Sequence, residues 1–292
     1  MASLSRRYSK NVDGRYFVDD SCINCDTCRQ LCTSVFDDGG GYSFVLSQPK
    51  TELEEKMTQM AIIACPTGSI GSTEEFERRI VRENFPLLLE DEVYYCGYNS
   101  PKSYGACSYF VNHSEGNWLI DSPRFSTYLN NKFKELGGIR YIFLTHRDDI
   151  ADARKYQQYY ENCEIIIHYY DRSAFRDADI KIKGEDETSI NQDFTIIPTP
   201  GHTKGHQVLL YKNKYIFTGD HLYWRRDWER LRATRNYCWY DWNEQIESMQ
   251  KLLNYKFEWV LPGHGQRIKL DAKKMNNELT WLVEQMKDPN YW

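Results

Sequence analysis

Five cysteines near the start of this chain constrain its fold more than any other feature. Four of them form a C-x2-C-x2-C-x3-C run, and the fifth lies farther along, directly before a proline. They are Cys22, Cys25, Cys28, Cys32 and Cys65. Two-residue spacings let three thiolates surround one corner of a cubane iron–sulfur cluster, while a remote cysteine binds the fourth iron. Four closely spaced cysteines can also form a zinc knuckle. The run therefore predicts a metal site of one of these two kinds.

Composition and charge indicate the compartment and exclude some partners. Residues 1–10 are basic with no apolar run behind them, so we expect no secretory signal. In a reducing cytosol, cysteine clusters are more often metal ligands than disulfides. No stretch approaches the roughly 18 apolar residues of a membrane helix, and a net charge of −5 gives no general reason to expect nucleic acid. We expect a cytoplasmic protein that binds neither membranes nor nucleic acid.

Residues 15–71 resemble a bacterial ferredoxin, both in the cysteine run and in the ending Ala64-Cys-Pro-Thr-Gly68. In two-cluster ferredoxins the fourth cysteine of one run binds the other cluster. Here the second run has lost its first three cysteines, so the resemblance implies a single 4Fe–4S cluster with four cysteine ligands. These are Cys22, Cys25, Cys28 and Cys65. Cys32 then has no second cluster to bind, and it is followed by Thr33 where the family has proline.

Farther along, the pattern becomes one of repeated strands and helices. The charged segment 74–84 could form a surface helix, and we place a domain boundary after it. Residues 1–84 then form a ferredoxin-like domain with its linker, and residues 85–292 form a second domain. Apolar residues at helical spacing predict a helix over 51–64 that ends before Pro66. Further strands and helices are predicted at 109–111, 118–120, 141–144, 164–167, 194–197, 208–211, 215–217, 241–253, 259–261 and 271–287. The predicted class is α/β.

Three later segments each place a histidine in the loop that follows a predicted strand. They are residues 144–149, 199–203 and 261–265, and Asp220 ends a fourth strand between the last two. Neutral imidazoles and a bridging carboxylate at strand ends are what a hydrolytic centre with one or two metals requires. Glycine beside a ligand lets the loop turn sharply. The pattern predicts a metal centre that includes His146, His202, Asp220 and His264.

In their order and separation, these segments resemble the metallo-β-lactamase superfamily over roughly residues 85–268. The resemblance implies an αββα sandwich with metals at one edge, preceded here by a small α+β ferredoxin-like domain. Residues 119–122, Leu-Ile-Asp-Ser, are similar to the first superfamily motif, in which an aspartate supports the site without binding metal.

The second superfamily motif, T-H-x-H-x-D-H, is altered. Residues 145–153 read Thr-His-Arg-Asp-Asp-Ile-Ala-Asp-Ala, so His146 matches the first ligand and Asp148 stands at the second histidine. The closing Asp-His pair matches residues 152–153 if two residues are inserted, and residues 150–151 otherwise. In both alignments the final histidine is missing.

The resemblance implies two unequal metal positions. The first would be held by His146, Asp148, His202 and Asp220. The second would keep only Asp152, Asp220 and His264, so we expect it to bind weakly, to bind a harder ion, or to stay empty. An aspartate in place of histidine adds an oxygen ligand and shifts preference from zinc toward iron or manganese. We expect one or two divalent ions, iron or zinc, with Asp152 and Asp220 as the catalytic carboxylates.

Two further features stay open. His221 is a candidate replacement for the missing histidine, although consecutive strand residues point to opposite faces. Residues 223–242 place five arginines among aromatic rings directly after Asp220. This segment is predicted either as a substrate wall that holds an anionic group or as solvated surface.

Three functions follow from these motifs. The first is a hydrolase of an ester, thioester or phosphoester, in which the iron–sulfur domain is a redox sensor or a structural module. The second is an oxidoreductase in which the 4Fe–4S cluster passes electrons to a non-haem iron site, as in flavodiiron proteins, a redox branch of the superfamily with a carboxylate at the second ligand. The third is a non-catalytic metal-binding module. We favour the hydrolase, with a small-molecule substrate, for which an anion is one candidate, and with an electron-transfer partner as a further candidate.

Overall fold

The computed structural model describes residues 2–291 and divides by its internal contacts into two compact units. The N-terminal unit comprises the chain up to Ile139 together with Ala151–Tyr160, and the C-terminal unit comprises Arg140–Ile150 and the chain from Glu161 onward. Met1 and Trp292, the outer ends of the two predicted domains, lie outside the described residues. The predicted boundary between residues 84 and 85 stays a prediction.

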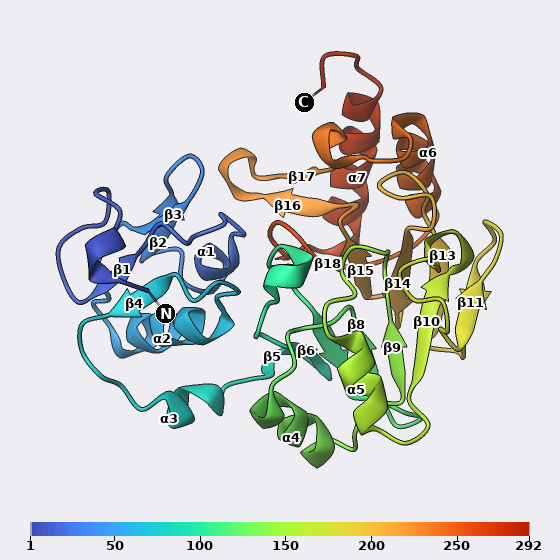
Figure 1. Cartoon of the computed structure of the whole chain (residues 1–292). Coiled ribbons are helices and arrows are strands. Elements are labelled where there is room, and N and C mark those ends of the chain that lie inside the picture. The colour runs from blue at the N-terminus through green and yellow to red at the C-terminus, as the bar shows by residue number, and fades with distance from the viewer. Residues whose placement is uncertain (1, 292) are drawn as a thin grey trace. The chain divides into compact units, whose positions relative to one another are not determined.

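The first part of the N-terminal unit contains two antiparallel strand pairs and two helices (Figure 1). β1 pairs with β4, and β2 pairs with β3. The bounds are β1 Tyr16–Val18, α1 Thr27–Leu31, β2 Phe36–Asp38, β3 Ser43–Val45, α2 Glu52–Ala64 and β4 Ile70–Ser72. These elements enclose one small core, made by Tyr16, Val18, Cys28, Phe36, Val45, Ala61, Ile62 and Ile70.

Local sequence explains both ends of α2. The Thr51 hydroxyl accepts the backbone N–H of Glu54, whose carboxylate accepts the N–H of Thr51 in return, so a capping box starts the helix. At the other end Pro66 pushes Cys65 out of the helical region. The predicted helix is confirmed, and its end delivers Cys65 to a fixed position beside the other cysteines.

The rest of the N-terminal unit is a four-stranded antiparallel meander with three helices. The strands are β5 Leu87–Glu90, β6 Val93–Tyr95, β7 Tyr109–Val111 and β8 Trp118–Ile120, and the helices are α3 Arg78–Arg82, α4 Thr127–Glu135 and α5 Ala153–Tyr159. The charged segment 74–84 is therefore helical over only five residues. Short 3-10 turns, η1 and η2, span Leu4–Arg6 and Pro101–Ser103.

The C-terminal unit contains a parallel three-stranded ladder and a mixed six-stranded sheet. The ladder has β10 between β9 and β11. The sheet has the order β12-β13-β14-β15-β18-β19, in which only β15 and β18 run parallel. The bounds are β9 Tyr141–Phe143, β10 Glu164–His168, β11 Ile180–Ile182, β12 Thr188–Ser189, β13 Phe194–Pro198, β14 Gln207–Tyr211, β15 Tyr215–Gly219, β18 Trp259–Pro262 and β19 Ile268–Lys269.

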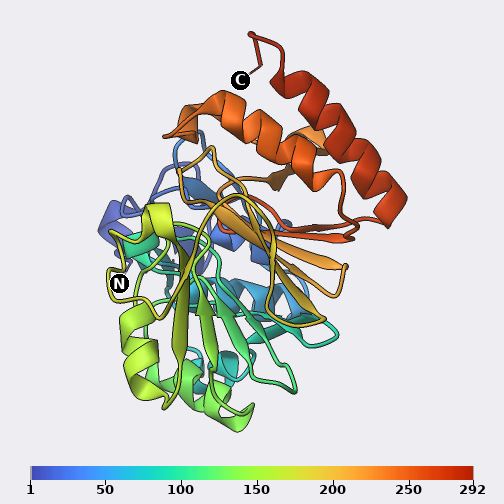
Figure 2. The same ribbon diagram turned by 90° about the vertical axis from the view of Figure 1, so that its right-hand side faces the viewer.

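Two amphipathic helices cover one face of the six-stranded sheet, as Figure 2 shows in orange and red. They are α6 (Trp242–Leu252) and α7 (Ala272–Met286). The side chains of Asp241 and Asp271 cap them by accepting backbone N–H groups of the first turn. Their apolar stripes pack on the strands in a core that includes Ile197, Val208, Ile216, Met249, Val260, Met275 and Leu279. A hairpin of β16 (Tyr223–Arg225) and β17 (Arg230–Arg232) and the turns η3 Tyr169–Asp171, η4 Arg226–Trp228 and η5 Arg235–Tyr237 complete the unit.

The predicted α/β class is confirmed, and each strand predicted from 109 onward is present to within two residues at either end. None of the helices within residues 2–291 combines the length and the apolar character needed to cross a membrane.

Candidate metal centre

The predicted ligands of the C-terminal unit stand in loops that follow four strands. His146 follows β9, His202 follows β13, Asp220 directly follows β15, and His264 follows β18. β15 and β18 run parallel and the N–H of Gly263 donates to the carbonyl of Gly219 at 2.8 Å, so their two loops leave the sheet at the same edge.

Two glycines allow these loops to turn. Gly201 has φ +148°, and a Cβ there would lie 2.6 Å from the Cα of Gln245. Gly219 has φ +49°, and a Cβ there would lie 2.5 Å from the hydroxyl of Thr145. A larger residue at either position would therefore displace the loop that carries His202 or Asp220.

Three imidazole nitrogens surround one carboxylate oxygen. Oδ2 of Asp220 lies 3.7 Å from Nε2 of His146, 3.8 Å from Nε2 of His202 and 3.8 Å from Nε2 of His264. Oδ2 of Asp148 lies 3.9 and 3.8 Å from the same nitrogens of His146 and His202. Ligands about 2.1 Å from a tetrahedral metal are separated by about 3.4 Å, so this donor set has the spacing of a coordination shell.

The hydrogen bonds of His146 and His202 leave their Nε2 atoms ready to bind a cation. Nδ1 of His202 donates to the carbonyl of Tyr237 at 2.5 Å, which fixes the tautomer with a lone pair on Nε2. Nδ1 of His146 lies 3.0 Å from the hydroxyl of Thr145. Both Nε2 atoms are buried and have no hydrogen-bond partner among residues 2–291. A buried nitrogen without a partner is costly unless a bound ion satisfies it.

The electrostatics of the centre favour a neutral His146 and an ionised Asp220. Burial lowers the pKa of His146 to about 3. Burial alone would raise the pKa of Asp220, but the imidazoles of His264 and His146 outweigh it and hold that pKa below its usual value. Burial raises the pKa of Asp148, whose side chain is still half-exposed. Neutral histidine and ionised aspartate are the forms that bind metal.

A third carboxylate that groups with these side chains is that of Asp149, which the sequence analysis did not include among the ligands. Asp149 is buried, and its carboxylate groups with His146 and Asp220 within 4.8 Å. A Cβ on Gly263 would lie 2.8 Å from Oδ2 of Asp149 and 2.9 Å from Oδ1 of Asp220, so both carboxylates lie against this glycine. The sequence signal was present as a second acidic residue directly after Asp148, but neither motif alignment places a ligand there.

Asp152 has other partners, all within the N-terminal unit. It precedes α5, and its carboxylate accepts the Lys102 ammonium at 2.7 Å and the backbone N–H of Phe125 at 2.9 Å. Lys155 lies 3.2 Å from the same carboxylate. Its oxygens are therefore already paired with two lysines and a backbone donor. Ala153, predicted to replace the last ligand histidine, is buried in the first turn of α5.

A buried aspartate that the sequence analysis missed connects two ligand loops. Oδ2 of Asp171 accepts the hydroxyl of Thr203 at 2.6 Å and the backbone N–H of Arg147 at 3.1 Å. Its Oδ1 accepts the N–H of Gly205 at 3.2 Å. Asp171 is fully buried, so these bonds position the loops of His146 and His202 against each other. No local motif marks this residue, because its partners are distant in sequence.

His221 lies behind the ligands rather than among them. Its ring stacks on that of His206 with centroids 4.7 Å apart, and burial lowers its pKa to about 3. It belongs to neither potential metal-binding group found among the described residues. His206 is held through Nδ1, 2.9 Å from the hydroxyl of Thr199. His168, at the end of β10, is hydrogen-bonded through Nε2 to the carbonyl of Gly184 at 3.0 Å.

The aromatic segment 223–242 contacts the centre at His202. The backbone N–H of Trp239 donates to the carbonyl of His202 at 2.9 Å, and the two rings are 6.2 Å apart. Tyr237 and Trp239 expose 61% and 59% of their surface, so large rings face solvent beside a predicted ligand. Four of the five arginines have other partners: Arg225 pairs with Asp227, Arg226 donates to Gln266, Arg230 pairs with Glu278, and Arg232 lies over the Trp228 ring.

In the N-terminal unit one small cavity is lined by all four cysteines predicted to hold the cluster. They are Cys22, Cys25, Cys28 and Cys65. Cys32 is not part of this lining, and its Sγ lies 3.6 Å from the hydroxyl of Ser34 instead. Burial raises the pKa of Cys25 to about 12 and that of Cys28 well above its usual value. A strongly positive group must therefore offset burial before these thiols ionise, and the donor set fits a cluster of iron ions.

Comparison with protein families agrees with both predicted resemblances. Residues 18–72 match the 4Fe-4S single cluster domain of Ferredoxin I, which favours the iron–sulfur cluster over a zinc knuckle. Residues 105–264 match the metallo-beta-lactamase superfamily.

Solved structures give the same fold assignment, and one curated relative matches part of the chain. An archaeal metallo-beta-lactamase superfamily protein from Sulfolobus tokodaii has a TM-score of 0.50 and 17% identity, over 69% of this chain and 88% of its own. The DIM-1 metallo-beta-lactamase has a TM-score of 0.52 and 16% identity, over 68% and 95%. A hydroxyacylglutathione hydrolase from Citrobacter koseri is 26% identical over 117 residues, which are 39% of this chain and 45% of that enzyme. The match thus spans less than half of that relative.

Proposed function

Because this chain belongs to the metallo-β-lactamase superfamily, we propose that it is a metal-dependent hydrolase of an ester, thioester or phosphoester. The observation that carries the proposal is the pair of buried Nε2 atoms of His146 and His202, which face carboxylate oxygens and have no hydrogen-bond partner among the described residues. Such a donor set can bind a cation.

The residues divide into two overlapping ligand sets. The first is His146, Asp148, His202 and Asp220. We assign Asp149, Asp220 and His264 to the second set, with Asp220 shared between the two. Asp149 groups with Asp220 and with His146, and Nε2 of His264 lies 3.8 Å from Oδ2 of Asp220. The second set has one imidazole and lacks the final histidine of the superfamily motif, so we expect it to bind its ion more weakly than the first.

The chain's own groups would then orient substrate and handle protons. A bound divalent ion lowers the pKa of water and polarises a carbonyl or phosphoryl group. Asp148 is the half-exposed carboxylate of the centre, so it can accept a proton from a water that reaches the site from solvent. Asp149 is buried and takes over the ligand role that the resemblance gave to Asp152.

The rim of the centre supports an anionic substrate with an apolar part. The ammonium of Lys204 lies 4.4 Å from the ring centre of Tyr170 and 5.6 Å from that of Tyr240, and it forms no ion pair within the described part of the chain. Together with the exposed rings of Tyr170, Tyr237, Trp239 and Tyr240 it offers one positive charge and four stacking surfaces. A thioester that carries a carboxylate fits this chemistry, in keeping with the hydroxyacylglutathione hydrolase relative.

The test uses full-length protein purified anaerobically with its metals quantified. Hydrolysis is measured with a hydroxyacylglutathione thioester, p-nitrophenyl acetate and bis-p-nitrophenyl phosphate. We expect one class to be hydrolysed, with His202→Ala reducing kcat/KM at least about a hundredfold. Lys204→Gln should raise KM if the hydrolysed substrate is anionic, as the thioester and the phosphodiester are, and should leave KM unchanged for uncharged p-nitrophenyl acetate. Hydrolysis that His202→Ala leaves unchanged would contradict the proposal.

A second candidate is supported by the carboxylates of the centre. Three aspartates around three histidines make an oxygen-rich set that suits iron better than zinc, and a 4Fe–4S domain precedes it in the chain. In this alternative, electrons pass from the reduced cluster to a non-haem iron site and on to dioxygen. Oxidation of the dithionite-reduced cluster by dioxygen would then be slower in His202→Ala than in the parent, whereas a hydrolase predicts equal rates.

A further inference from the structure

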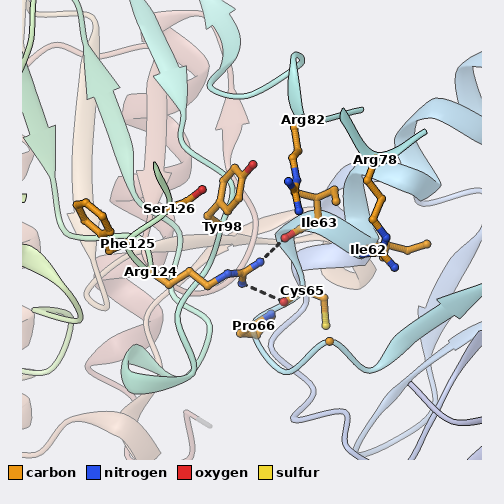
Figure 3. A pocket seen from close by; sticks show the side chains of 11 residues that line it. Ile62, Ile63, Cys65, Pro66, Arg78, Arg82, Tyr98, Arg124, Phe125 and Ser126 are labelled. Atoms are coloured by element: carbon orange, nitrogen blue, oxygen red, sulfur yellow. Dashed lines mark hydrogen bonds between the residues drawn. The ribbon is translucent and has the colours of Figure 1, made fainter. Parts of the chain in front are cut away.

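A cavity of about 380 Å³ in the N-terminal unit is lined by three arginines and by one of the cluster cysteines (Figure 3). Arg78 and Arg82 extend from successive turns of α3, and Arg124 comes from the segment after β8 on the other side. The three side chains lie around the C-terminal end of α2, where Cys65 begins the loop that holds the cluster. No acidic residue is among the eleven that line the cavity.

The three positive charges have no carboxylate partners within the described chain. Arg78 and Arg82 are exposed, and neither makes an ion pair there, although Arg78 lies over the ring of Phe76. Bringing like charges together is unfavourable unless an anion offsets the repulsion. This local excess stands out in a chain of net charge −5. The cavity also offers apolar walls, from Ile62, Tyr98 and Phe125.

Arg124 is fixed in place by the backbone around the cluster loop. Its guanidinium donates to three carbonyl oxygens, and these bonds hold its positive charge beside the cysteine loop. The acceptors are Ile63, Cys65 at 3.0 Å and Asn99 at 2.6 Å. The ring of Tyr98 lies 5.4 Å from the guanidinium carbon. A ligand would therefore meet one arginine that is already oriented, which lowers the entropy lost on binding, and two exposed arginines that can close on it.

We propose that this cavity binds a small anion bearing carboxylate or phosphate groups next to the iron–sulfur cluster. Guanidinium groups recognise both kinds of oxyanion through charge-assisted hydrogen bonds. The residues of this site lie outside the metal centre, and this proposal does not depend on the hydrolase proposal.

The position of Cys65 couples the anion to the cluster. Cys65 lines both the arginine cavity and the cluster cavity. Reduction of a 4Fe–4S cluster adds one electron and therefore one negative charge, which an adjacent anion disfavours. Binding of the anion thus lowers the reduction potential of the cluster, and by reciprocity reduction of the cluster weakens anion binding.

The experiment uses the full-length holoprotein, purified anaerobically, with succinate and inorganic phosphate as probes in isothermal titration calorimetry. We expect saturable binding of at least one probe, and the preferred probe identifies a carboxylate or a phosphate ligand. The double variant Arg78→Gln/Arg82→Gln should bind about tenfold more weakly or worse. Arg79→Gln is the matched control, because Arg79 is exposed on the same helix and does not line the cavity.

A second readout is the midpoint potential of the cluster in a dithionite titration. The preferred probe should lower it in the parent and in Arg79→Gln, and the double variant should need at least about tenfold more probe for the same shift. Absence of saturable binding of both probes would overturn the proposal, and so would equal affinities in the two variants. Both arginines are exposed, so we expect their replacement to leave the fold intact. An unchanged cluster spectrum in the double variant checks this.

Discussion

The carboxylate of Asp171 accepts the hydroxyl of Thr203 at 2.6 Å, next to His202, while the same oxygen accepts the N–H of Arg147 next to His146. One buried side chain therefore sets the distance between two predicted metal ligands. Hydrogen bonds of this kind orient ligands without touching the ion.

Asp171→Asn should weaken metal binding by about 10–100-fold, because an amide cannot accept all of these hydrogen bonds at once. The measurement is a competition titration with a metal chelator, followed by metal analysis. Asp179→Asn is the control, since Asp179 accepts the N–H of Ile165 at the start of β10 and holds no ligand loop. Equal affinity in the two variants would show that the ligand loops are rigid without Asp171.

Asp149→Asn should remove metal from the second ligand set, whereas Asp152→Asn should leave the metal content unchanged. Asp149 groups with His146 and Asp220, while Asp152 is paired with Lys102. The number of ions per chain, measured by mass spectrometry after gel filtration, tests this directly. A loss of metal in Asp152→Asn alone would restore the ligand set predicted from the sequence.

Asp152→Asn should instead lower the free energy of unfolding, by about 1–3 kcal/mol at pH 7. Burial alone would raise the pKa of Asp152, but hydrogen bonds from Lys102 and the N–H of Phe125 hold it below its usual value. A depressed folded-state pKa contributes stability above the unfolded value of about 3.9, and that contribution is lost as the pH falls through the folded pKa.

Urea unfolding of the parent and Asp152→Asn between pH 7 and pH 3 measures this difference, which should shrink toward the acid end. Lys102→Met should reproduce part of the loss, and the double variant should lose less than the sum. A difference that stays constant over this pH range would mean that the carboxylate charge contributes nothing.

Cys65→Ser should abolish the brown chromophore of the cluster, while Cys32→Ser should retain it. Cys65 lines the cavity shared by the four predicted ligands, and Cys32 does not. Absorption and iron and sulfide content of anaerobically purified protein give the answer. An intact cluster in Cys65→Ser, or a lost one in Cys32→Ser with the fold preserved by circular dichroism, would contradict the assignment.

Ala153→His should destabilise the protein without raising its metal content. The alignment with a two-residue insertion places the missing ligand histidine at this position, but Ala153 is buried in the first turn of α5. A larger side chain there overpacks its surroundings at a cost of about 1–3 kcal/mol. Melting temperature and metal analysis of one preparation are sufficient, and added metal at unchanged stability would support the insertion.

The sequence by itself determined the features that depend on local chemistry. Helices α2, α6 and α7 form at their predicted positions, because Thr51, Asp241 and Asp271 cap them and their apolar residues recur at helical spacing. The four predicted cluster cysteines were identifiable from their spacing. The four predicted ligands that follow strands were identifiable because strand ends at one sheet edge bring such residues together.

Only the tertiary structure decided which acidic residue of the altered motif joins the centre. Motif alignment counts residues along the chain, whereas the path of the loop depends on its backbone. Ala151 adopts φ +31° and α5 starts two residues later, so Asp152 meets Lys102 while Asp149 is left with His146. The role of Asp171 and the arginine cavity could not be predicted from the sequence for a related physical reason. Their partners are far apart in sequence, and only folding brings their charges together.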